Sequence, residues 1–258
     1  MDLAEVNEMI STYIRPQTFP FAVRFCESLD EVPGGARIPH ESLRMQIPIC
    51  QAVGMVRRYG WTIALTPEDM SCPYGALALG FVRPKAGFLD GSYADSMSPG
   101  SGQRARISAG DAARLEFGKY AAVLLSPLHS ATFQPHLIVI YGNSAQVMRL
   151  VQGTLHGQGG YLTSRASGGM DCSDLFAQPI ETGEAQVILP CNGDRVFGMT
   201  QDDEMAFSLP AALVDRTMEG LKASHNTGQR YPTPSNLRFK AQLPPAYYQL
   251  MDYLNAED

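Results

Sequence analysis

The feature that most constrains the fold is a pattern that the chain shows twice. Each half reads as a short apolar strand, an amphipathic helix, a second strand and a Gly- or Pro-rich turn that carries a cysteine. In the first half, residues 21–25 and 61–65 are the apolar runs. Between them, apolar residues of 48–60 recur at helical spacing, with Pro48 at the first position and Gly60 at the end. This half therefore predicts a strand-helix-strand unit.

The second half has the same order of signals. Residues 121–125 and 137–141 are continuous apolar runs of the kind found in central strands. Asn143 or Ser144 can cap the helix that follows, and residues 161–164 and 186–189 read as further strands. We therefore expect an α+β (or α/β) fold of two similar strand-helix-strand lobes packed together, as an internal duplication would produce.

The remaining segments set the predicted domain boundaries. Residues 1–225 should form one compact domain, with repeat halves at 14–84 and 119–200. The polar stretch 85–118, rich in Ser and Gly, should be an insert or lid. Residues 226–258 should be a C-terminal extension with a short helix.

Composition excludes several classes of function. The chain has 258 residues and a formal net charge of −6, and it lacks the long basic run that a nucleic-acid grip requires. No run of about 18 apolar residues occurs, so we expect no membrane span. The first residues are acidic, unlike a secretory signal, and this predicts a cytoplasmic location. The pattern predicts no particular oligomeric state.

Five cysteines are the residues best suited to chemistry. In a reducing compartment they are free thiols or ligands and not disulfides. Cys50 falls in the first turn of a predicted helix, where free N–H groups favour a thiolate. Cys72, Cys172 and Cys191 each lie on a turn with Pro or Gly within three residues, as metal–thiolate sites require. Cys26 ends a predicted strand and reads as a packed core thiol.

The spacing of the cysteines argues the other way. No Cys-x-x-Cys pair occurs and the gaps between cysteines are long, so the local pattern of zinc sites and ferredoxin-like clusters is missing. Buried structural thiols are the usual fate of single cysteines. The residues alone leave both readings open.

At these same positions the chain resembles the ArCR proteins, a prokaryotic family of unknown function, from about residue 10 to 222. The motifs that carry the resemblance are Arg15-Pro16-Gln17-Thr18-Phe19-Pro20, Cys50-Gln51-Ala52, Ser71-Cys72-Pro73, Ile140-Tyr141-Gly142-Asn143, Cys172-Ser173-Asp174 and Cys191-Asn192-Gly193-Asp194-Arg195. The family's cysteine motifs fall on Cys50, Cys72, Cys172 and Cys191 and leave Cys26 out. The resemblance implies a cytoplasmic protein of anaerobes and archaea, which suits a [4Fe–4S] cluster.

The leading hypothesis is an iron–sulfur protein, either a redox enzyme or an electron-transfer subunit in anaerobic metabolism. Its partner would be a redox protein or a small-molecule substrate. Asp174 could act as acid or base and Arg195 could anchor an anionic substrate, so both are candidate catalytic residues. With three thiolate ligands the open iron could act as a Lewis acid.

Two alternatives remain open at this point. Zinc held by the same four thiolates could support the fold of a small-molecule binding or interaction protein. Metal-free catalysis by Cys50 at its helix start is the other.

Overall fold

The computed structural model describes residues 2–233 and 242–256. Its centre is one six-stranded antiparallel sheet with the order β2-β3-β1-β4-β6-β5. The bounds of the strands are β1 Phe21–Cys26, β2 Ile63–Leu65, β3 Ala122–Pro127, β4 Leu137–Gly142, β5 Gln186–Ile188 and β6 Met205–Pro210. The α+β prediction is confirmed.

The two halves of the sheet repeat one topology. In each unit the first strand pairs with the third and the third with the second, which gives the orders β1-β3-β2 and β4-β6-β5. The registers correspond as well, because Phe21 of β1 lies opposite Pro127 and Leu137 of β4 lies opposite Pro210. The units join through the antiparallel β1–β4 pair. The prediction of two facing lobes is therefore wrong, since both units build a single continuous sheet.

Two layers of helices cover the sheet. On one face, Val53 and Val56 of α3 (Ile49–Tyr59) belong to a buried cluster with alternate residues of β1 and with α4 (Pro73–Ala78). On the other face, α1 (Leu3–Tyr13), α8 (Ser144–Leu155) and α11 (Val214–Asn226) pack on the intervening strand residues. The small and branched strand residues are buried on both faces, which explains their continuous apolar runs.

Several helix ends follow their local signals. The Asp2 side chain accepts a hydrogen bond from Ala4 N at the start of α1, and Gly60 ends α3 with φ of 73°. Asn143 forms a capping box with Gln146 at the start of α8. The predicted boundaries at Gly60 and Asn143 are confirmed.

One predicted strand does not form, and one strand of the sheet was not predicted. Residues 161–164 form no strand. Among the described residues, their one hydrogen bond to the edge strand β5 is donated by Val187 N to the Ser164 hydroxyl, so they do not pair with β5 through their backbone. The residues of strand β6 show no clear alternation of apolar and polar side chains. The strand pairs with β4 and β5 and is buried on both faces, so alternation is not required.

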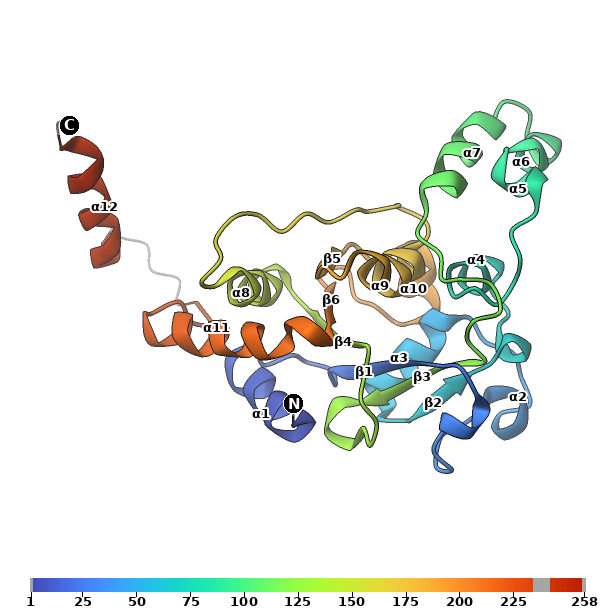
Figure 1. The fold of residues 1–258 in the computed structure, drawn as a ribbon, viewed down its shortest axis with the longest axis horizontal. Coiled ribbons are helices and arrows are strands. Elements are labelled where there is room, and N and C mark those ends of the chain that lie inside the picture. Colours follow the sequence, from blue (N-terminus) through green and yellow to red (C-terminus); the bar gives the residue numbers. More distant parts are fainter. Residues whose placement is uncertain (1, 234–241, 257–258) are drawn as a thin grey trace.

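The insert and the C-terminal segment leave the body of the molecule. Helices α5 (Ala86–Leu89), α6 (Ser92–Met97) and α7 (Gly102–Asp111) form a separate projection beside α4 (Figure 1). Helix α12 (Pro245–Asn255) has no buried residues and stands apart beyond α11. Among the described residues, no helix has the length and apolar character that crossing a membrane requires.

Candidate metal centre

Four of the five cysteines lie where a helical segment begins. Cys50 is in the first turn of α3, and Cys72 is the N-cap residue of α4. Cys172 precedes the π-helical turn η4 (Ser173–Ala177), and Cys191 is the N-cap residue of α10 (Asn192–Phe197). The first backbone N–H groups of a helix have no partner within the helix. At Cys191 the N–H groups of Gly193 and Asp194 interact with the sulfur. After Cys172, by contrast, the N–H groups of Ser173 and Asp174 donate to the carbonyl oxygen of Met170.

The fold brings these thiols to one side of the sheet. Figure 1 shows α4, α9 (Gln178–Thr182) and α10 gathered next to α3. A Cβ atom placed on Gly193 would lie 3.5 Å from Cys191 Sγ and 3.9 Å from Cys50 Sγ. Cys172 is buried in the hydrophobic cluster of this face, and Cys72 packs against the same cluster. The four thiols thus come from four distant segments to one region.

The pKa shifts show the same proximity. Burial raises the pKa of Cys172 well above its ordinary value, and the charges of Asp171, Cys72, Cys191 and Cys50 raise it further. Burial also strongly raises the pKa of Cys50. The charges of Asp194 and Asp171, and then those of Cys72 and Cys191, raise it further. Without a bound cation, these two thiols are protonated at neutral pH.

Cys26 is outside this group. It lies at the end of β1, fully buried among Ala64, Ala122 and Leu124. This cluster is separate from the one that holds Cys172. The prediction that Cys26 is a packed core thiol is confirmed.

Close contact between α3 and α10 holds Cys50 near Cys191. A Cβ on Gly54 would lie 2.8 Å from the carbonyl oxygen of Gly198. A Cβ on Gly198 would lie 2.9 Å from the carbonyl oxygen of Cys50 and 2.3 Å from Asp194 Oδ1. Neither position can accept a side chain unless the two helices separate. These glycines therefore set the distance between the two cysteine-bearing segments.

Asp171 is the carboxylate in direct contact with a thiol. Its Oδ1 accepts a hydrogen bond from Cys191 Sγ at 3.0 Å, and its Oδ2 accepts one from Cys191 N at 3.0 Å. Burial and the hydrogen bond to Asp171 raise the pKa of the Cys191 thiol, whereas the backbone N–H groups of Asp194 and Gly193 lower it. Cys191 therefore has both a proton acceptor and N–H donors at its sulfur.

A buried polar network lies next to the thiols. Asp194 Oδ2 accepts hydrogen bonds from the Tyr141 hydroxyl at 2.9 Å and from the Thr200 hydroxyl at 2.9 Å, whereas its buried Oδ1 has no hydrogen-bond partner among the described residues. Burial, and then the charge of Asp171, raise the pKa of Asp194 to about 6. The guanidinium of Arg57 lies 4.1 Å from the centre of the Tyr141 ring. The network thus connects α3 with the Cys191 turn.

A cavity of about 800 Å³ lies beneath the insert helices, and none of the four thiols lines it. Its lining includes Tyr74, two residues after Cys72, and Met170 and Asp174, two residues on either side of Cys172. The Asp174 carboxylate accepts hydrogen bonds from the backbone N–H and the hydroxyl of Ser167. The cavity has the volume of a small-molecule site.

The two predicted catalytic residues are in different places. Asp174 lines the cavity. Arg195 is on α10, where it donates to the carbonyl oxygen of Gln201 and lies 3.6 Å from the exposed Asp202. The cavity lining contains Arg165 and does not contain Arg195. The structure therefore does not bring Arg195 and Asp174 together.

The chain belongs to the uncharacterised ArCR family. The family model matches residues 9–220. This range contains both units of the sheet and all four clustered cysteines of this ArCR protein, and it ends before α12. Comparisons with curated proteins and with solved structures gave no significant match.

Several site residues were not predicted from the sequence. Asp194 follows Cys191 by three residues, and Tyr141 ends an apolar run, so both looked like ordinary turn and strand residues. The burial of Arg57 could have been predicted from the sequence, because Arg57 lies four residues after Val53 and therefore on the same, buried face of α3. A cation at an inward position indicates a buried partner, here Glu204.

Proposed function

We propose that this ArCR protein is an iron–sulfur protein in which Cys50, Cys72, Cys172 and Cys191 hold a [4Fe–4S] cluster. The observation that carries the proposal is that four thiols from four distant segments meet on one face of the sheet while the fifth, Cys26, does not. Structural thiols have no reason to gather in this way. Thiolates are the ligands that iron–sulfur clusters require.

A cluster tolerates a wider arrangement of thiolates than a single zinc ion does. Among residues 2–233 and 242–256, no three His, Cys, Asp or Glu side chains are close enough together to hold one metal ion. Zinc would need all its thiolates about 2.3 Å from one point. A cubane takes one thiolate on each iron and accepts a wider arrangement. The zinc alternative would therefore require the side chains to move inward.

The chain's own groups would support loading and tuning of the site. Ligand thiols must lose their protons when metal binds, and Asp171 is 3.0 Å from Cys191 Sγ, in position to accept one. The N–H groups of Gly193 and Asp194 that lower the pKa of Cys191 would also delocalise sulfur charge. A bound cluster would supply one-electron transfer, or Lewis acidity at an open iron.

The cavity lined by Tyr74, Met170 and Asp174, each two residues from Cys72 or Cys172, favours an enzyme that acts on a small molecule. Asp174 is available there as acid or base, and Arg165 is better placed than Arg195 to pair with an anionic group. The insert helices would cover the substrate. A redox partner protein would deliver or remove electrons.

Metal-free catalysis by Cys50 is the less favoured alternative. A nucleophilic thiol needs a neighbouring cation or base that lowers its pKa. The groups that influence Cys50 are carboxylates and other thiols, and all of them raise its pKa.

The repeated topology extends the proposal. We infer that the two sheet units derive from an internal duplication, because their strand orders and registers correspond. Cys72 and Cys191 then occupy equivalent points. Each is the N-cap residue of the first α-helix that follows, along the chain, the second strand of its unit (β2 or β5). One unit would thus supply Cys50 and Cys72 and the other Cys172 and Cys191.

The test is quantification of iron, sulfide and zinc in protein purified and reconstituted without oxygen. We expect about four irons and four sulfides per chain, as a [4Fe–4S] cluster contains, with a brown colour and a paramagnetic signal after reduction. Cys50→Ala, Cys72→Ala, Cys172→Ala and Cys191→Ala should each lower the iron content.

Cys26→Ala is the matched control, because it removes a buried thiol outside the site. It should retain full iron content. Colourless protein without iron and sulfide, zinc at one per chain, or equal loss of iron in Cys26→Ala would contradict the proposal.

A further inference from the structure

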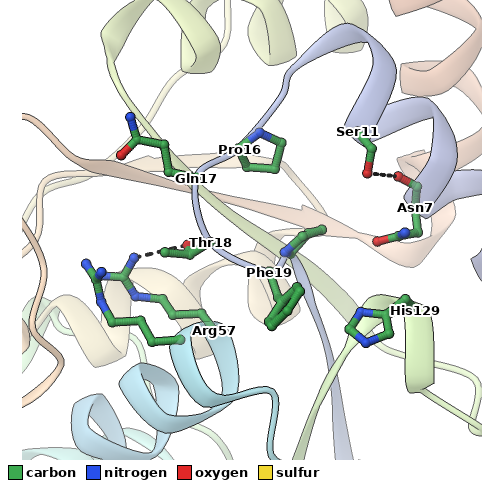
Figure 2. Close-up of a pocket in the computed structure, with 10 residues that line it drawn as sticks. Asn7, Ser11, Pro16, Gln17, Thr18, Phe19, Arg57 and His129 are labelled. Atoms are coloured by element: carbon green, nitrogen blue, oxygen red, sulfur yellow. Dashed lines mark hydrogen bonds between the residues drawn. The ribbon is translucent and has the colours of Figure 1, made fainter.

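A second cavity lies on the other side of the Arg57 network from the thiols. It has a volume of about 570 Å³ and is bounded by α1, the loop of residues 15–20, the end of α3 and the 3-10 turn η3 (Leu128–Ser130) (Figure 2). We call it the arginine pocket, because Arg57 and Arg58 both line it. Its volume is within the range of small-molecule sites.

The loop that forms one wall is held in a fixed conformation. Arg15 has a left-handed backbone with φ of 54°, which is unfavourable for a residue with a Cβ. Gln146 Nε2 holds this strained turn by donating to the carbonyl oxygens of Ile14 and Arg15. Phe19 N also donates to the carbonyl oxygen of Arg57. Strain that the surrounding structure maintains is typical of ligand sites.

The charge of the arginine pocket favours an anion. The side chains of Arg57 and Arg58 share one carboxylate, that of Glu204. The lining itself contains no Asp or Glu among the described residues. Asp194, a further carboxylate that interacts with Arg57, contacts it only through Thr200 and the Tyr141 ring. Within the part of the chain that the structure describes, the pocket lining therefore carries two cations and no anion of its own, because Glu204 and Asp194 both lie outside it.

Hydrogen-bond donors remain unused at the pocket. Arg57 Nη1 donates to the Thr18 hydroxyl at 3.2 Å, so the hydroxyl proton of Thr18 is left to donate elsewhere. The Nε atoms of Arg57 and Arg58 are buried and have no hydrogen-bond partner among the described residues. Arg58 uses Nη2 for Met199 O and Glu204. The two Nε atoms are out of reach of solvent, so the donors that a ligand can meet are the Thr18 hydroxyl and the partly exposed Arg58 side chain.

Part of the pocket wall is apolar, beside the polar side chains of Asn7, Ser11 and Gln17. The rings of Phe19 and His129 lie beside each other with centroids 4.9 Å apart, and Pro16 lies nearby on the same loop (Figure 2). An inorganic anion would leave this part unfilled. A flat organic group could pack against Phe19 while its charged end faces the arginines.

From these features we propose that the arginine pocket binds a small organic anion. A carboxylate or phosphate group is held by Arg58 and Thr18, and a ring or hydrocarbon group lies against Phe19. The fully buried Arg57 positions the Thr18 hydroxyl. This site is separate from the thiols and does not depend on whether they hold a cluster.

Isothermal titration calorimetry of the full chain tests the proposal. Benzoate and phenyl phosphate each join a ring to an anion, whereas benzamide lacks the charge and inorganic phosphate lacks the ring. We expect saturable one-site binding of benzoate or phenyl phosphate, tighter than that of both comparison compounds. The relative affinities of the two organic anions distinguish a carboxylate site from a phosphate site.

Variants connect the binding to the pocket. Arg58→Gln removes a charge-assisted contact and should weaken binding of the organic anion about tenfold or more. Thr18→Val keeps both arginines and should weaken it by a smaller factor. Arg230→Gln, which removes the same charge at an exposed position, should bind as the wild type does.

Thermal unfolding of each variant establishes that it is folded, and Thr18→Val remains the test if Arg58→Gln is not. Absence of saturable binding of both organic anions overturns the proposal. So does equal binding by inorganic phosphate or benzamide, or unchanged binding in the Arg58 and Thr18 variants.

Discussion

Replacing Glu204 by Gln should be among the most destabilising single changes in this protein. Glu204 accepts hydrogen bonds from Arg57 at 2.7 and 3.0 Å, from Arg58 at 3.0 Å and from Gln201 N at 2.7 Å. The side chain of Arg57 is fully buried and that of Glu204 is 10% exposed. A glutamine side chain has only one acceptor oxygen, and its NH₂ group would face an arginine donor.

The expected magnitude follows from the burial of the pair. Removing one partner of a buried ion pair costs about 3–5 kcal/mol, because the remaining charge stays desolvated. Here two guanidinium groups lose their shared carboxylate, and the fully buried Arg57 cannot reach water. For a chain of this size the loss corresponds to a decrease of roughly 6–20 °C in melting temperature.

Urea unfolding at neutral pH measures this loss. Asp202→Asn is the control, because the Asp202 side chain is fully exposed and its pairing with Arg195 at 3.6 Å should contribute nothing measurable. A loss below about 1 kcal/mol in Glu204→Gln would refute the reasoning, since it would place the ion pair among exposed pairs.

The pH dependence provides a second measurement on the same variant. Burial raises the pKa of Glu204, but the hydrogen bond from Arg57 and the charges of both arginines lower it by more, so it is below its ordinary value. A depressed carboxylate pKa stabilises the fold above the ordinary pKa of about 4.3 and loses this effect as the pH falls through the folded-state value. The difference between wild type and Glu204→Gln should therefore shrink in acid.

Two further predictions concern other parts of the structure. Gly198→Ala should push α3 away from α10, which should lower the free energy of unfolding by about 1–3 kcal/mol and reduce the iron content after reconstitution. Gly34→Ala is the control, because its position has open space, and it should change neither the free energy of unfolding nor the iron content. The hydrogen bond that the His40 ring donates to the Asp69 carboxylate raises the pKa of His40. His40→Asn should therefore destabilise the protein below about pH 6.5, with the effect disappearing as the pH rises through the folded-state pKa, as urea unfolding across pH would show.

Local signals were sufficient for much of the helical structure. The Asp2 cap, the Gly60 stop and the Asn143 capping box lie within a few residues of the turns that they stabilise, so the sequence pattern alone predicts them. The sequence also separated Cys26 from the other thiols, because a strand end differs locally from a helix start. Both distinctions depend on neighbours along the chain.

Tertiary structure decided the arrangement of the sheet and of the site. Strand β6 is specified by its partners β4 and β5, and the interaction of Arg57 with Glu204 joins residues 147 positions apart. The approach of Cys50 to Cys191 depends on contact between Gly54 and Gly198 on different helices. Such contacts arise only when distant segments pack, so no local periodicity encodes them.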